Sequence, residues 1–108
     1  MGTEYLGEFE HLVLLAVLRL EDEAYGVPIR RTIEERAERA VSFGAVYSTL
    51  RRLEAKELVA AVTATPDASS GRPKRIFHLT EPGLEALNAA QRRLHKMADG
   101  CHGLTLKL

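Results

Sequence analysis

Residues 40–80 read AVSFGAVYSTLRRLEAKELVAAVTATPDASSGRPKRIFHLT, and this stretch predicts a helix followed by a two-strand hairpin with a basic tip. In the helical part, apolar side chains recur at helical spacing and are expected to point into a core: Phe43, Val46, Leu50 and Leu53. The opposite side is small at its start and basic one turn later: Gly44, Tyr47, Ser48, Arg51, Arg52 and Ala55. Small residues allow close approach, and guanidinium groups bind phosphate oxygens or guanine edges. The stretch therefore predicts a helix that packs on one side and enters a DNA groove with the other.

Length and composition predict a single domain in a cytoplasmic protein. The chain has 108 residues, of which 45% are hydrophobic, enough for one core and too few for two independent domains. The longest apolar run, residues 12–18, is far shorter than the ~18 residues of a membrane-spanning helix, and acidic residues precede it. A signal peptide and a membrane anchor are therefore not supported. The single cysteine, Cys101, excludes an intrachain disulfide and offers no zinc-ligand pair, so we expect neither a metal nor a cofactor.

Charge is distributed unevenly along a chain whose net charge is zero. Residues 1–23 carry six acidic and one basic residue, residues 24–80 ten basic and six acidic, and residues 81–108 four basic and three acidic, giving local nets of −5, +4 and +1. No acidic residue lies between Asp67 and Glu81, where Arg72, Lys74 and Arg75 cluster. A basic potential is thereby focused on one region, although a solvated hairpin tip would have the same composition.

Two helices are expected before the quoted stretch. The first, residues 6–20, is apolar on several sides, which indicates burial from several directions and favours a partner subunit. The second begins at Tyr25 and Gly26, has Pro28 in its first turn and runs to about Arg39. A short connector at residues 40–41 would join it to the third helix, with Ser42 as N-cap. Two helices joined this tightly predict a helix-turn-helix.

A hairpin and a fourth helix complete the predicted fold. Residues 58–64 and 74–80 are β-prone and flank a loop rich in proline, glycine and serine, which is typical of a wing. Thr80 is expected to cap the last helix, which ends near Gly100 and carries a coiled-coil seam. The prediction is a mainly α-helical winged helix-turn-helix with a small β-hairpin over residues 1–80, followed by a dimerisation helix and tail over residues 81–108.

Four motifs occur in the order expected of one family. LGEFEHLVLLAVL at 6–18, AYG at 24–26, SFGAVYSTLRRLEAKELV at 42–59 and GRPKRIFHLTEPG at 71–83 together resemble the PadR family of bacterial transcriptional regulators over nearly the whole chain. The resemblance implies a homodimer whose winged helix-turn-helix domains read a palindromic DNA operator. It also implies repression as the usual mode, release by a small molecule, and no enzymatic activity.

The chain departs from the family pattern at two positions. Glu57 stands after the third helix where the family usually has glycine, and a non-glycine residue in a left-handed conformation there costs about 1 kcal/mol. A strained or differently built turn into the first wing strand is therefore expected. Ser48 replaces a frequent proline and offers a hydroxyl to phosphate or base.

Two sets of site residues follow from these patterns. We expect Ser48 and Arg51 nearest the base edges, Tyr47 and Arg52 near the backbone, and the wing on phosphates or in the minor groove. The full DNA-binding set is Ser42, Gly44, Tyr47, Ser48, Arg51, Arg52, Lys56, Arg72, Lys74 and Arg75. The expected dimer interface is Leu6, Phe9, Val13, Leu87, Ala90, Leu94, Met97 and Cys101. For Leu84 and Leu87, at the start of the last helix, we expect packing on the chain's own domain as well.

Other functions remain as alternatives. A small apolar or aromatic effector is expected in a pocket lined by Phe9, Met97 and the leucines, against the alternative of ordinary interface core; the chain has no tryptophan to stack on such a ligand. Glu8, Glu10 and His11 are adjacent, but no catalytic constellation accompanies them. His95, Cys101 and His102 would suit metal or redox sensing, although a cysteine on an apolar seam is more often inert. The neutral charge keeps open a winged-helix module that contacts proteins instead of DNA.

Overall fold

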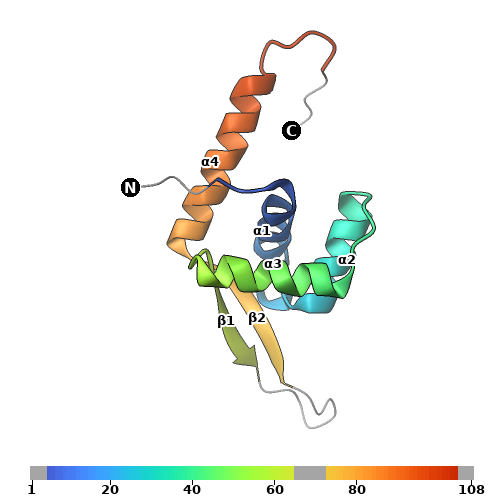
Figure 1. Ribbon diagram of the computed structural model, residues 1–108, viewed down its shortest axis with the longest axis vertical. Coiled ribbons are helices and arrows are strands. Elements are labelled where there is room, and N and C mark those ends of the chain that lie inside the picture. Colours follow the sequence, from blue (N-terminus) through green and yellow to red (C-terminus); the bar gives the residue numbers. More distant parts are fainter. Residues whose placement is uncertain (1–4, 65–72, 105–108) are drawn as a thin grey trace.

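The computed structural model of the protein describes residues 5–64 and 73–104 (Figure 1). Its elements are α1 (Glu8–Leu20), the 3-10 turn η1 (Glu21–Glu23), α2 (Gly26–Arg36), α3 (Phe43–Ala55), β1 (Val59–Ala64), β2 (Lys74–Leu79) and α4 (Glu81–Ala98). The hairpin projects from one end of the helical body and α4 from the other (Figure 1). The predicted winged helix-turn-helix with a long final helix is confirmed. None of the described helices is long and apolar enough to cross a membrane.

The core is built around α1, which contacts α2, α3, α4 and β2. Val13 and Leu14 of α1 have no exposed surface, and Leu53 of α3 is equally enclosed. Burying such side chains contributes about 1.5–3 kcal/mol each. The helix starts at Glu8, two residues later than expected, because the amide of Gly7 is bound by the Glu10 carboxylate at 3.0 Å and so caps the helix.

The turn between α2 and α3 is longer than predicted. Helix α2 ends at Arg36 instead of about Arg39, because Glu38 has a φ of 53° and cannot continue a right-handed helix. The connector is therefore residues 37–42. Ser42 caps α3 as expected, since its hydroxyl accepts a hydrogen bond of 3.1 Å from the amide of Ala45.

The wing is an antiparallel pair in which Val59 lies opposite Leu79 and Ala64 opposite Lys74. The turn that leads into it contains Glu57, whose φ of 62° is the left-handed conformation anticipated at this position. The first strand nevertheless pairs along its whole length. On its other edge, β2 is tied to the helices because the amide of Phe77 donates a 2.8 Å hydrogen bond to the carbonyl of Ala24. The expected wing tip, with Arg72, lies outside the described residues.

Helix α4 begins on the core and then leaves it (Figure 1). Thr80 caps the helix by accepting a 3.0 Å hydrogen bond from the amide of Gly83. Along the first half, Leu87 and Ala90 are buried, and Gln91 is joined to His11 of α1 by a 2.6 Å hydrogen bond. Beyond that bond most of the helix is exposed, so its outer half stands free of the domain.

Candidate nucleic-acid interface

The third helix presents an exposed row of residues opposite its buried face. Gly44, Ser48 and Arg51 are exposed, while the buried positions of α3 are Val46, Thr49, Leu50 and Leu53. Within the described part of the chain, the Arg51 guanidinium has no hydrogen bond or ion pair. The Ser48 hydroxyl donates to the carbonyl of Ala45 at 3.3 Å, so its remaining capacity is as an acceptor. The expected outward row is thus exposed, with one guanidinium free to bind an external group.

The prediction that Phe43 points into the core is wrong. Its side chain is 39% exposed, with the guanidinium of Arg30 4.5 Å from the ring centroid. The ring of Tyr47 stacks with that of Phe43, with the two centroids 6.4 Å apart. The reason is that α2 offers Arg30 at this first turn of α3, so a cation over the ring replaces apolar packing.

Tyr47 joins the two helices of the helix-turn-helix. Its ring end lies against the backbone of Gly26, where α2 begins, and a Cβ atom at residue 26 would come within 2.6 Å of Cζ of Tyr47. The tyrosine is still 45% exposed, so one edge packs and the other faces solvent. This contact explains the glycine of the AYG motif. Sequence inspection missed it because the two residues belong to different helices.

One flank of α3 is held by a carboxylate of α1. The Oε2 atom of Glu10 lies 3.1 Å from Nζ of Lys56 and 3.6 Å from Nε of Arg52. Burial on its own would raise the pKa of the Glu10 carboxyl group. The hydrogen bond from Gly7 and the charges of Lys56 and Arg52 outweigh burial, so this pKa lies below its ordinary value. Two of the expected DNA-binding cations are therefore already paired with Glu10.

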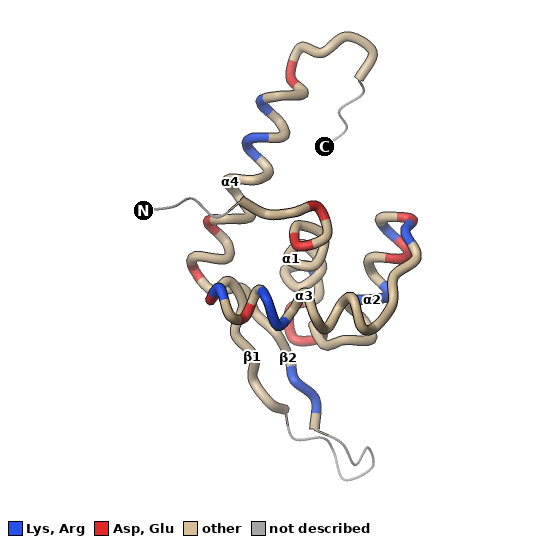
Figure 2. Tube along the Cα trace, in the orientation of Figure 1, with Lys and Arg blue, Asp and Glu red and all other residues tan. Residues whose placement is uncertain are grey.

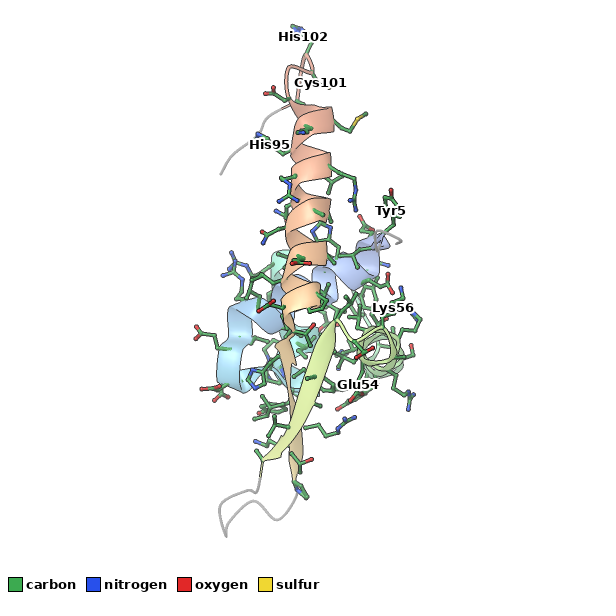
Figure 3. The ribbon with its side chains drawn as sticks, turned by 90° about the vertical axis from the view of Figure 1, so that its left-hand side faces the viewer. Tyr5, Glu54, Lys56, His95, Cys101 and His102 are labelled. Atoms are coloured by element: carbon green, nitrogen blue, oxygen red, sulfur yellow. The ribbon has the colours of Figure 1, made fainter. Side chains whose placement is uncertain are left out.

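The other flank of α3 meets the wing. Nη2 of Arg75 on β2 lies 2.8 Å from Oε2 of Glu54 on α3. Lys74 lies 4.4 Å from the ring centroid of Tyr25 and 3.5 Å from its hydroxyl. Figure 3 shows Glu54 and Lys56 on the side of the molecule where α3 lies. The described wing cations are exposed, but each is oriented by a neighbour on the helical body.

The structure divides the expected dimer residues into two groups. Val13, Leu87 and Ala90 are at most 5% exposed and pack in the core of their own chain, because α1 and the first half of α4 cover each other. Val13 and Ala90 therefore do not form a free surface, contrary to the expectation, whereas Leu87 packs on its own domain as anticipated. Leu94 and Met97 are 61% and 78% exposed. Leu6 and Phe9 are half-buried, and Cys101 is exposed.

Two further observations concern α4 and the residues that follow it. Leu84, expected to pack on its own domain, is 42% exposed. Figure 3 places His95, Cys101 and His102 toward the outer end of α4. Among residues 5–64 and 73–104, no group of three histidine, cysteine or acidic side chains is arranged to hold a metal ion.

An apolar cleft of about 540 Å³ lies between α1 and α2. Its lining is Leu12, Leu15, Ala16, Leu18, Arg19, Glu21, Thr32, Ile33, Arg36 and Ala37. Leu15 and Leu18 are 37% and 47% exposed beside it. Neither Phe9 nor Met97 lines this cleft, so it is not the pocket expected from the sequence.

A helix-turn-helix with an exposed second helix of the pair, followed by a basic two-strand hairpin, defines the winged helix-turn-helix class of nucleic-acid-binding proteins. A sequence profile of the transcriptional regulator PadR-like family matches residues 14–89. The chain belongs to this family, and it is accordingly a DNA-binding transcriptional regulator and not an enzyme.

Solved structures of similar proteins agree with this assignment. A PadR family transcription regulator from Clostridium difficile is 26% identical, with a TM-score of 0.71 over 84% of this chain and 91% of its own. A PadR family transcriptional regulator from Eggerthella lenta is 26% identical, with a TM-score of 0.67 over 86% and 81%. RosR of H. salinarum is 25% identical, with a TM-score of 0.69 over 93% and 84%. A search among proteins with curated descriptions found no match.

Proposed function

We propose that this protein is a homodimeric transcriptional repressor that binds a palindromic operator and leaves it when a small apolar or aromatic molecule binds. The observation that carries the proposal is the exposed row of α3. In this row Arg51 has no partner among the described residues, and the preceding positions Gly44 and Ser48 are small. Figure 2 shows basic residues on α3 and on β2, and the ion pair between Arg75 and Glu54 brings the two elements together.

Residues of the exposed row have different roles in DNA binding. Arg51 and Ser48 face the base edges in the major groove, because a guanidinium binds guanine in a bidentate manner. Gly44 allows the helix backbone to approach closely. Contacts with the phosphates position the protein on the duplex. The residues proposed to make them are the capping Ser42, Tyr47, Arg52, Lys56 and the wing residues Arg72, Lys74 and Arg75.

The outer half of α4 forms the dimer. Leu94 and Met97 expose apolar surface on a helix that has already left its own core, and a second copy would bury that surface. Leu6, Phe9 and Cys101 complete the proposed contact area. A twofold axis through α4 sets the separation of the two α3 helices, which must be about 34 Å to meet successive major grooves.

The effector binds in the cleft between α1 and α2. Its mainly apolar lining and its volume of about 540 Å³ suit a small apolar or aromatic molecule, to which Arg19, Glu21, Thr32 and Arg36 could add polar contacts. A ligand there touches the helix that precedes α3 in the helix-turn-helix. It releases DNA only through a difference in affinity between the bound and free arrangements of the dimer.

Selection of bound duplexes from a random pool tests the DNA-binding part of this proposal. We expect a palindromic sequence whose half-sites are about one helical turn apart, bound with an affinity that falls steeply with salt. Recovery of a sequence without twofold symmetry would refute dimeric reading. Failure to enrich any duplex, or a flat salt dependence, would favour a winged-helix module that contacts proteins.

A further inference from the structure

Cations stand on both flanks of the recognition helix α3, and on each flank they are paired with a carboxylate of the same chain. On one flank, Glu10 of α1 holds Lys56 at 3.1 Å and Arg52 at 3.6 Å. On the other, Glu54 holds Arg75 of the wing at 2.8 Å. Arg51, on the exposed row between them, has no such partner within the described residues.

The positions of these charged residues around α3 follow from helical geometry. Successive residues of a helix are turned by about 100°, so Arg52 and Glu54 fall on opposite edges of the exposed row that contains Arg51. A helix lying in the major groove has a phosphate strand on either side. In this placement the paired cations face the two phosphate strands, and the unpaired guanidinium of Arg51 faces the base edges.

We propose that the carboxylates of Glu10 and Glu54 compete with the DNA phosphates for the cations on the flanks of α3. Each cation must leave its carboxylate before it can bind a phosphate and the duplex is fully bound. This inference rests on the proposed placement of α3 in the major groove. Breaking an ion pair costs free energy, which reduces the net binding free energy gained from the new phosphate contact. This cost is the same for every DNA sequence, because the phosphates are the same. The competitors therefore weaken binding to all duplexes alike, while discrimination between sequences stays with Arg51 and Ser48.

The two carboxylates differ in how firmly they hold their cations. The side chain of Glu10 is 10% exposed and its pKa is lowered, so the group is ionised at neutral pH and fixed by the amide of Gly7. Glu54 has a 35% exposed side chain and Arg75 a 54% exposed one, so this pair opens more readily. Glu54 is for this reason the better residue to change without disturbing the fold.

The test compares the wild-type protein with the Glu54→Gln variant in binding to the selected operator and to a random duplex of equal length. We expect the variant to bind both duplexes roughly two- to fivefold more tightly at moderate salt, by the same factor, as for the loss of an exposed ion pair. The matched control is Glu85→Gln, which removes the same charge from an exposed position of α4. The control should leave both affinities unchanged within error.

A double-mutant cycle shows whether Glu54 acts through Arg75. The gain from Glu54→Gln should vanish when Arg75 is already replaced by glutamine. A gain that persists there would mean that Glu54 repels the duplex directly, and it would overturn the exchange. Unchanged or weaker binding by Glu54→Gln while the wild-type protein binds its operator would also overturn the inference and leave the proposed function standing. A wild-type protein that binds no duplex would refute both.

The buried competitor is tested in the same way. Glu10→Gln keeps an oxygen for the amide of Gly7 and should raise the affinity for both duplexes, with the gain abolished when Lys56 and Arg52 are replaced by glutamine. A thermal melt of each variant shows that the fold is retained. Weaker binding by a folded Glu10→Gln protein would mean that Glu10 positions these cations for DNA, the reverse of competition.

Discussion

Gly83 in the first turn of α4 packs directly on the backbone of Leu58, where the chain enters β1. A Cβ atom at residue 83 would lie 2.9 Å from the carbonyl carbon of Leu58 and closer still to its oxygen. That oxygen also accepts a 3.1 Å hydrogen bond from the amide of Thr80, so it cannot move away without losing the bond. We expect Gly83→Ala to lower the free energy of unfolding by about 1–3 kcal/mol in urea denaturation followed by circular dichroism.

Gly44→Ala is the matched control for this change. An added Cβ atom there would meet nothing closer than the hydroxyl oxygen of Ser42 at 3.9 Å. Because alanine is favoured over glycine in helices, the stability of this variant should be equal to or above that of the wild type. A similar loss in both variants would show that the contact with Leu58 is not the cause.

Glu57→Gly should stabilise the protein. The left-handed φ of 62° is unfavourable for a residue with a side chain, and glycine removes a cost of about 1 kcal/mol. The hydrogen bond that Thr80 donates to the carbonyl of Glu57, at 2.7 Å, is unaffected by the change. The midpoint of urea unfolding measures the gain. Glu57→Ala removes the charge but keeps Cβ, so an equal gain from alanine would assign the effect to charge.

Local features of the fold were predictable because they depend on few neighbouring residues. The hydroxyls of Ser42 and Thr80 each accept a bond from an amide three residues ahead, and such caps are visible in the sequence. The burial of Val46, Leu50 and Leu53 along α3 was predicted in the same way, whereas the exposure of Phe43 and the burial of Thr49 were not. At Glu57, the missing glycine marked a strained turn in advance.

Contacts between distant residues were not predictable from periodicity. Glu10 and Lys56 are 46 residues apart, and neither has a pattern that points to the other. The apolar seam of α4 predicted contact with a partner at Ala90 as well as at Leu94, but periodicity alone does not distinguish the buried Ala90 from the exposed Leu94. That distinction depends on where α1 stops covering α4, which is a property of the tertiary fold.

Acid should remove the stabilisation that Glu10 contributes. Its pKa is lower in the folded protein than in the unfolded chain, so the folded state binds fewer protons. The stabilisation by Glu10 is fully present at pH values above the ordinary carboxyl pKa. It is lost as the pH falls from that value through the lower pKa of Glu10 in the folded protein. We expect Glu10→Gln to cost roughly 1 kcal/mol at neutral pH and progressively less in acid. Urea unfolding of both proteins at several pH values measures this difference, and a difference that grows in acid would contradict the assignment.

Arg51 and Lys74 should affect DNA binding in different ways. Arg51→Ala removes the unpaired guanidinium of the exposed row, so it should cost about 1–3 kcal/mol on the operator and relax the preference at one base pair. Lys74→Ala should weaken all duplexes alike and reduce the salt slope by about one. Titrations of the operator and of single-base variants measure both effects. Equal losses from the two changes on every duplex would remove the proposed division between base reading and phosphate contact.

Leu94→Glu should convert the dimer to monomers in sedimentation velocity at micromolar concentration. The side chain is 61% exposed in the single chain, so a charge there is tolerated in the monomer but must be desolvated when two α4 helices pack together. His95→Glu is the matched control, because one residue further along α4 the side chain is turned by about 100°, away from the line of Leu94 and Met97. The control should remain dimeric. A dimer that persists in Leu94→Glu would place the interface elsewhere, with the exposed Leu15 and Leu18 of α1 as the next surface to test.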